Sequence, residues 1–187
     1  MKSFEIQLWL LRALQVNSAD ILIPNYYFGM YEADIFRVNK QGYTIEYEIK
    51  ISKADFRKDF TKSHRVFVKN EQGEIEKEEY TDKRGNKYKR WKTINVTKHQ
   101  HIQEGNRTNK FYFCCPEGLI DKSEIPKEYG LIYFTPGEYL RWRIVKQAKF
   151  LHKNKATETI YRDCAQNLST RRLSMQVDNL RLKRVKQ

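Results

Sequence analysis

The stretch from residue 44 to residue 51 alternates between two kinds of side chain, and this constrains the fold more than any other segment. Its apolar members are Ile45, Tyr47, Ile49 and Ile51, and its charged members are Glu46, Glu48 and Lys50. Because successive side chains of a β-strand point to opposite faces, the pattern predicts a strand with one core face and one charged face. Alternation alone would equally suit a solvent-exposed face carrying salt bridges.

The segment before this strand adds a second carboxylate. A strand is predicted over residues 31–38, followed by a turn over residues 39–42. If Gly42 takes the left-handed conformation in a three-residue hairpin loop, the register places Asp34 opposite Glu48. Directly paired side chains lie about 5 Å apart on one face of a sheet. The two carboxylates are therefore expected side by side.

Two neighbouring carboxylates repel each other unless a cation lies between them. Oxygen ligands suit Mg²⁺ or Mn²⁺, so Asp34 and Glu48 are the predicted metal ligands, with the backbone carbonyl of Ile49 as a further one. Lys50, two residues along the same face, is placed to orient or deprotonate water or to stabilise charge on a phosphate. The triplet Glu48-Ile49-Lys50 alone is weak evidence, since chance supplies a few such triplets in a chain this rich in acids and lysines.

Residues 32–36 (EADIF) and 46–56 (EYEIKISKADF) together resemble the PD-(D/E)XK nuclease superfamily. Within it they are similar to the MmcB-like DNA repair proteins, which carry an Asp strand, an E-x-K strand and an S-x-A-D-F helix start. Residues 111–116 and 130–132 look like the later strands of that family. The resemblance reaches from the first predicted helix to about Phe134.

This resemblance implies a restriction-endonuclease-like α/β fold, with a central mixed sheet flanked by helices. It also implies one or two divalent metals and hydrolysis of phosphodiester bonds in DNA. By position, Asp34 and Glu48 would be metal ligands and Lys50 the catalytic lysine. Glu5 matches a helix carboxylate that some members use to complete the metal site; the alternative is a favourable charge at the helix N-terminus.

The chain departs from the family pattern in two places. Ala33 stands where a proline often precedes the first Asp, and a polar, charged segment over about residues 65–96 reads as an inserted β-hairpin. The insertion leaves open whether Lys62 or Lys98 fills the basic position that follows the acidic helix.

The rest of the chain fits one nuclease-like domain over residues 1–187, with that insertion and a basic tail from about residue 170. Apolar periodicity and breakers predict the other elements. Helices are expected over residues 3–15 with Ser3 as N-cap, 54–60, 98–103 and 157–175, an extended segment over 21–24, and strands over 110–115, 130–134 and 141–145.

The charge of the chain favours a polyanionic partner. Lys and Arg number 36 against 23 Asp and Glu, which gives a net charge of +13, and contacts between basic side chains and phosphates release counterions from nucleic acid. The insertion interleaves basic and aromatic residues in a way that can grip a backbone and stack a base, although a solvated hairpin tip would have the same composition. The predicted DNA contacts are Lys62, Lys83, Arg84, Lys87, Lys89, Arg90, Trp91 and Lys98.

Other classes of site find little support. Cys114, Cys115 and Cys164 form no disulfide framework and no zinc spacing, so they are expected to fill the core, and free thiols suit the cytoplasm. The histidines lack a third ligand at a convincing spacing, although one of them could contact a phosphate. Asp55 and Asp59 read as salt-bridge partners on a helix face. No signal peptide, membrane span, Walker loop or dinucleotide fingerprint is recognisable.

The sequence thus predicts a divalent-metal-dependent deoxyribonuclease, acting in DNA repair, a phage genome or a mobile element. A homodimer is compatible with cutting both strands of a duplex. Two alternatives stay open: the same fold used to bind nucleic acid or a protein partner without cleavage, and an RNA-processing nuclease.

Overall fold

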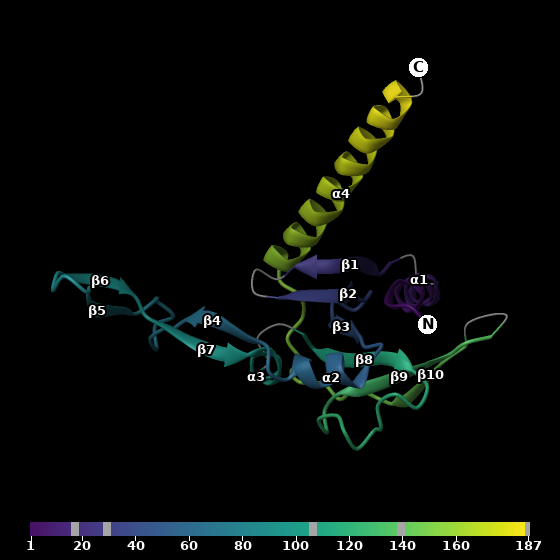
Figure 1. The fold of residues 1–187 in the computed structure, drawn as a ribbon, viewed down its shortest axis with the longest axis horizontal. Helices are drawn as coiled ribbons and strands as arrows, with labels where there is room; N and C mark the ends of the chain where they lie inside the picture. Colours follow the sequence, from purple (N-terminus) through teal and green to yellow (C-terminus); the bar gives the residue numbers. More distant parts are fainter. Residues whose placement is uncertain (16–18, 28–30, 105–107, 138–140, 186–187) are drawn as a thin grey trace.

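The computed structural model describes residues 1–15, 19–27, 31–104, 108–137 and 141–185. The body is a six-stranded sheet in the order β1-β2-β3-β8-β9-β10, in which β3-β8 and β8-β9 are parallel and the other pairs antiparallel (Figure 1). The strands are β1 (Ile21–Tyr27), β2 (Glu32–Val38), β3 (Thr44–Ile49), β8 (Lys110–Pro116), β9 (Gly130–Thr135) and β10 (Arg141–Lys146). The predicted α/β class with a central mixed sheet flanked by helices is confirmed.

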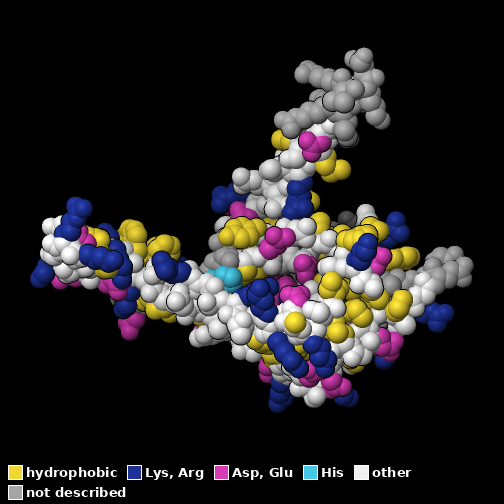
Figure 2. All heavy atoms as spheres, viewed as in Figure 1, with side chains coloured by type: hydrophobic (Ala, Val, Ile, Leu, Met, Phe, Trp, Pro, Cys, Tyr) yellow, Lys and Arg dark blue, Asp and Glu magenta, His cyan; other side chains and the backbone are white. Residues whose placement is uncertain are grey.

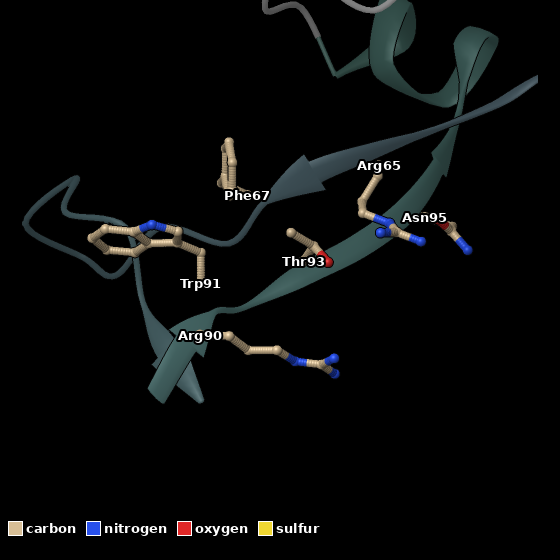
Figure 3. Close-up of a pocket in the computed structure, with 6 residues that line it drawn as sticks. All are labelled: Arg65, Phe67, Arg90, Trp91, Thr93 and Asn95. Carbon is tan, nitrogen blue, oxygen red and sulfur yellow. The ribbon is translucent and has the colours of Figure 1, made fainter. Parts of the chain in front are cut away.

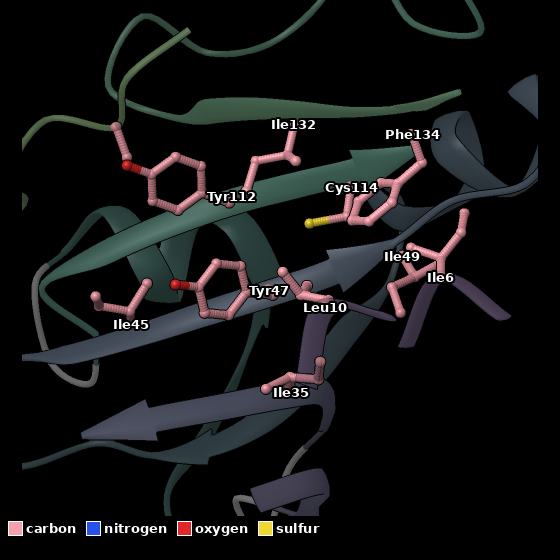
Figure 4. Packing of buried hydrophobic residues seen from close by; sticks show 11 residues of the cluster. Ile6, Leu10, Ile35, Ile45, Tyr47, Ile49, Tyr112, Cys114, Ile132 and Phe134 are labelled. Atoms are coloured by element: carbon pink, nitrogen blue, oxygen red, sulfur yellow. The ribbon is translucent and has the colours of Figure 1, made fainter. Parts of the chain in front are cut away.

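Helices cover both faces of the sheet. They are α1 (Ser3–Leu14), α2 (Lys53–Asp59), α3 (Lys98–Gln103) and α4 (Glu158–Val185). The α1 side chains Ile6 and Leu10 pack against one face, together with Tyr47, Cys114 and other apolar side chains of β2, β3, β8 and β9 (Figure 4). Phe56 of α2 lies in the cluster on the opposite face. The prediction of Ser3 as the N-cap of α1 is wrong by one residue, since Lys2 takes that position.

The aromatic strand β8 supplies side chains to both cores by alternation. Phe111, Phe113 and Cys115 belong to the cluster under α2 and α3, whereas Tyr112 and Cys114 belong to the cluster under α1. Each thiol is free and fully buried. Cysteine here acts as a small apolar residue, as the sequence predicted.

The turn between β2 and β3 has the predicted geometry. Gly42 has φ +84°, the Asn39 amide donates a hydrogen bond to the Tyr43 carbonyl at 2.9 Å, and the Gly42 amide donates to the Asn39 carbonyl at 2.8 Å. In the ladder that follows, Ile35 pairs with Tyr47. The next position along this register sets Asp34 opposite Glu48.

The inserted segment between α2 and α3 forms a long arm, defined here as residues 63–97, which projects from the body (Figure 1). It holds two antiparallel ribbons: β4 (Ser63–Phe67) with β7 (Thr93–Thr97), and β5 (Lys77–Thr81) with β6 (Lys87–Trp91). A single β-hairpin was expected over about residues 65–96, in which residues 87–94 would form one strand. The strand divides at Lys92, whose carbonyl accepts a hydrogen bond from Val68 and whose amide donates to Glu76, so this residue joins the two ribbons.

The C-terminal helix extends farther than predicted. The segment expected as a basic tail from about residue 170 continues α4 to Val185 (Figure 1). Neither glycine nor proline occurs after residue 157, so no residue type that breaks a helix interrupts it. Although α4 has 28 residues, none of the helices in the described ranges is long and apolar enough to cross a membrane.

Gly130 marks a close approach inside the sheet and gives a stability prediction. A Cβ atom at this position would lie 2.3 Å from the Tyr112 ring and 2.9 Å from the Ala148 backbone nitrogen. We expect Gly130→Ala to lower the free energy of unfolding by about 1–3 kcal/mol, the usual cost of overpacking. Chemical denaturation measures the change. A loss well below about 1 kcal/mol would show that Tyr112 and the neighbouring backbone relax freely around the added methyl group.

Candidate functional site

Asp34 and Glu48 lie at facing positions of β2 and β3, near the ends of the two strands. One Asp34 carboxylate oxygen, Oδ2, accepts a hydrogen bond from the Ile49 amide at 2.6 Å. The Asp34 carbonyl accepts another from Gln7 Nε2 of α1 at 2.8 Å. The Ile49 amide therefore fixes the carboxylate beside Glu48, and Gln7 of α1 fixes the backbone of Asp34.

Lys50 follows β3 on the same face and is 1% exposed. Its ammonium group lies 2.9 Å from Glu48 Oε1 and 2.9 Å from Asp59 Oδ1. Burial by itself lowers the pKa of a lysine, but these two carboxylates outweigh it and raise the pKa of Lys50 above its ordinary value. Lys50 is therefore a positioned cation, which suits charge stabilisation rather than removal of a proton from water.

Lys98 is a second buried cation at the same carboxylate. Its Nζ lies 2.6 Å from Glu48 Oε2 and 3.6 Å from Glu46 Oε1, and the side chain is 1% exposed. Its ammonium group also lies 4.8 Å from the centre of the Tyr31 ring. Carboxylates and aromatic rings thus enclose Lys98, which distinguishes it from the other predicted DNA contacts.

Asp59, at the end of α2, connects these lysines to the opposite helix. It is 0% exposed, and besides Lys50 it binds Lys62 Nζ at 2.8 Å and His99 Nε2 at 2.8 Å. The other ring nitrogen of His99 lies 3.1 Å from the Tyr129 hydroxyl. The imidazole is thus held on both sides within the core.

The sequence predicted Asp59 to be a salt-bridge partner on a helix face, which it is, but its burial was not predicted, although a signal for burial was present. Phe56 and Phe60 stand three residues before and one residue after Asp59, so all three lie on one side of the helix. Both rings pack in the core under the sheet. An aspartate between two core aromatics must face inward and requires a buried cation as its partner.

The charges here form what we call the buried ion network, whose members are Glu46, Glu48, Asp59, Lys50, Lys62, Lys98 and His99. Its three carboxylates are matched by three ammonium groups, and Asp34 adds a further carboxylate at the edge. Burial and the nearby Glu48 charge raise the pKa of Asp34 to about 6, although the Ile49 hydrogen bond partly opposes this. A raised pKa is the response of a carboxylate that lacks enough positive charge around it.

The donors at this edge of the network suit a divalent metal only as a partly hydrated ion. In the described parts of the chain, no three carboxylate, imidazole or thiolate groups gather in the manner of a metal cage. Mg²⁺ does not need such a cage, because it retains several waters and is commonly held by one or two carboxylates. Asp34 and Glu48 are chemically suited to that role, and the raised pKa of Asp34 marks the place where added positive charge is favourable.

Two further residues were predicted to help the metal. The amide of Ile49 is used by Asp34, and its carbonyl remains a predicted ligand. The Glu5 carboxylate accepts a hydrogen bond from the Lys2 amide at 2.6 Å. Glu5 therefore caps α1, which is the alternative role that the sequence allowed.

The predicted DNA contacts on the arm lie apart from this network. They are exposed, with Lys83 and Arg84 in the turn between β5 and β6, and Lys87, Lys89, Arg90 and Trp91 on β6. Lys62, at the base of the arm, is half-exposed. The arm shows basic and hydrophobic side chains next to one another on the face seen in Figure 2. Arg90 also pairs with Glu78 at 2.8 Å.

Comparison with known proteins adds one distant likeness. No protein-family model and no curated protein matches this chain. A solved structure, described as the SPO1766 protein of unknown function from Silicibacter pomeroyi, is similar over 91% of this chain and 83% of its own, with 15% identity and a TM-score of 0.48. This likeness supports no inference about function.

Proposed function

We propose that the chain is a divalent-metal-dependent nuclease of the PD-(D/E)XK type that hydrolyses phosphodiester bonds in DNA. One observation carries the proposal: Asp34 and Glu48 are the next residues beyond the Ile35–Tyr47 pair of β2 and β3 and interact electrostatically, and the ammonium group of Lys50 lies 2.9 Å from Glu48. The net charge of +13 supports a polyanionic substrate.

Each residue has a separate task in this proposal. A Mg²⁺ or Mn²⁺ ion held at this site would act as a Lewis acid toward the phosphate and toward water. Asp34 and Glu48 hold it, and Ile49 fixes the orientation of the Asp34 carboxylate. Lys50 places a fixed positive charge where negative charge grows on the phosphate during attack by water. Asp59 holds Lys50 in place from the other side.

A second candidate is a nucleic-acid-binding protein on the same scaffold that does not cleave. It is favoured by the ion pairs of Glu48, because Lys50 and Lys98 each take one of its two carboxylate oxygens. Cleavage requires Glu48 to share an oxygen with the metal, whereas simple binding leaves the network as it stands.

Asp34→Asn separates the two candidates. The amide oxygen can still accept the hydrogen bond from Ile49, so the strands keep their register while one negative charge is lost. We expect labelled single- and double-stranded DNA to be cut in Mg²⁺ or Mn²⁺, not in EDTA, and cleavage by the variant to fall by about a hundredfold or more. RNA of the same sequence shows whether the sugar matters.

A matched control is Glu32→Gln, an exposed carboxylate two residues earlier on the same strand, which should cut like the native protein. We also expect Mn²⁺ to raise the unfolding temperature of the native protein and not that of Asp34→Asn. DNA binding without cleavage in any metal would favour the second candidate. Cleavage that survives Asp34→Asn would show that the activity comes from elsewhere.

A further inference from the structure

A hollow of about 570 Å³ lies on one face of the arm, outside the buried ion network (Figure 3). It is lined by Arg65, Phe67, Arg90, Trp91, Thr93 and Asn95. The strand ladder explains how most of these side chains come together. Arg65 pairs with Asn95 and Phe67 with Thr93, and alternation places Trp91, two residues before Thr93, on that same face.

Two aromatic rings in the hollow are open to solvent. Phe67 is 54% exposed and Trp91 49% exposed. The ammonium group of Lys77 lies 4.5 Å from the centre of the Trp91 ring, a cation–π distance that holds the indole in place. A large exposed ring that is held by a neighbour, rather than buried, is suited to stack on a flat partner.

The polar groups around the rings define the charge of that partner. The lining contains one amide, one hydroxyl and two guanidinium groups, of which that of Arg90 is paired with Glu78, and none of the six side chains is a carboxylate. Arg65 and Asn95 lie beside each other in Figure 3, on the part of the ribbon nearest the body. Stacking rings next to hydrogen-bond donors and positive charge match a base with its phosphate, whereas a protein-docking patch would be more continuously apolar.

The arm is also joined directly to the candidate active site. Its strand β7 ends at Thr97, and the next residue is Lys98, which binds Glu48. At the base of the arm, the Lys98 amide donates a hydrogen bond to the Lys62 carbonyl at 2.9 Å. Trp91 lies seven residues from Lys98, a span of roughly 23 Å at the rise of a strand. A chain that lies along this face therefore runs toward Asp34 and Glu48.

We infer that this face of the arm binds single-stranded nucleic acid, with Trp91 and Phe67 stacking on unpaired bases and Arg65 contacting a phosphate. Paired bases hide their faces within the duplex, so exposed rings distinguish unpaired from paired strands. Single-stranded or locally unpaired nucleic acid is thus the substrate class of the proposed nuclease. This rests on the proposed function, because only the nuclease gives the bound strand a direction toward Asp34 and Glu48.

The test measures binding in EDTA, so cleavage does not enter. Fluorescence anisotropy compares a labelled oligothymidine of about 16 nucleotides, at the upper end of single-strand site sizes, with a blunt duplex of equal length. We expect Trp91→Ala to weaken binding of the single strand about tenfold and to leave duplex binding nearly unchanged. Trp91→Phe, which keeps a stacking ring, should retain most of the affinity. Arg65→Ala should lower the salt dependence of single-strand binding by about 0.7 in log–log slope.

Two matched controls guard against general effects. Trp142→Ala removes a tryptophan of similar exposure from β10, and Ile94→Ala removes an exposed side chain from the opposite face of β7. Both should bind like the native protein. Equal losses of affinity for single strand and duplex in Trp91→Ala would overturn the inference. Full affinity in Trp91→Ala would also overturn it, and a protein partner would then be the occupant of this face.

Two outcomes distinguish a failure of the single-strand site from a failure of the proposed nuclease. Trp91-dependent binding without metal-dependent cleavage would refute the nuclease and keep the single-strand site. Cleavage with binding that does not depend on Trp91 would refute the single-strand site alone.

Discussion

Lys50→Met is expected to lower the rate of metal-dependent DNA cleavage by about 10²–10⁴-fold, the usual range for losing one positioned polar group from an active site. The replacement keeps the long stem and removes the charge. That charge is aimed by two carboxylates, Glu48 Oε1 and Asp59 Oδ1, each 2.9 Å away. Because Lys50 is buried and stays protonated, its contribution is a fixed field at the reacting phosphate.

Single-turnover cleavage at saturating protein isolates the chemical step, and anisotropy in EDTA checks that DNA is still bound. Lys53→Met is the matched control, since Lys53 lies three residues farther on and pairs with Glu124 at the surface. A Lys50→Met protein that folds, binds DNA and cuts at the native rate would remove Lys50 from the mechanism. Lys50→Arg, which keeps the charge and changes its shape, should recover part of the rate if the field is what matters.

The pairing of Asp34 with Glu48 could be predicted because the relevant information is local. Gly42 specifies a short hairpin loop, and a two-residue alternation follows it, so only one register places the apolar side chains of β3 in the core. The structure has that register, and β3 provides the expected charged face. The apolar strands and amphipathic helices could also be recognised one by one, whereas the central mixed sheet flanked by helices was expected from the family resemblance.

The position of Lys98 could not be predicted in this way. The arm separates it from Asp59 in sequence, and the ladder between β4 and β7 brings them back together. Lys62 and Lys98 were both compatible with the sequence, because nothing local shows that a long polar ribbon closes on itself. The structure uses both lysines, with Lys98 at Glu48 and Lys62 at Asp59.

The extent of the arm and of α4 escaped prediction for another reason. Lys92 lies within a run of strand-forming residues, and only its hydrogen bonds to Val68 and Glu76 divide that run into β6 and β7. In α4, a charged segment with little apolar pattern suggested a tail, although its residue types propagate a helix well. Hydrogen bonds to other strands thus decided where β6 ends, and intrinsic helix propensity decided how far α4 extends.

Asp59→Ala is expected to have the largest effect on stability, a loss of about 3–5 kcal/mol in the free energy of unfolding at neutral pH. Removing one member of a buried ion pair leaves its partners charged without compensation. Here the charged partners are Lys50 and Lys62, each bound through Asp59 Oδ1, and the His99 ring nitrogen at Oδ2 would lose its hydrogen-bond partner. Urea denaturation of the native protein and the variant measures the difference.

The dependence on pH gives this prediction a second readout. Burial tends to raise the pKa of Asp59, but the His99 hydrogen bond and the charges of Lys98, Lys50 and Lys62 outweigh it and hold the pKa below the ordinary value of 3.8. A carboxyl group of this kind stabilises the fold above its unfolded pKa, and the stabilisation is lost as the pH falls through the folded value. The gap in stability between native protein and variant should therefore be widest near neutral pH and shrink below about pH 4.

Asp55→Asn is the matched control for Asp59→Ala, because it changes an aspartate of the same helix whose side chain is 44% exposed and 3.7 Å from Lys50. We expect it to cost about 1 kcal/mol or less, as exposed ion pairs do. A loss of similar size in both variants would mean that the buried ion network is as well hydrated as the surface. A large loss of stability confined to the Asp59 variant, and a smaller loss in acid, would show that this carboxylate holds the cations of the network in place. Lys50 would then owe its position to Asp59, a residue that need not contact the substrate.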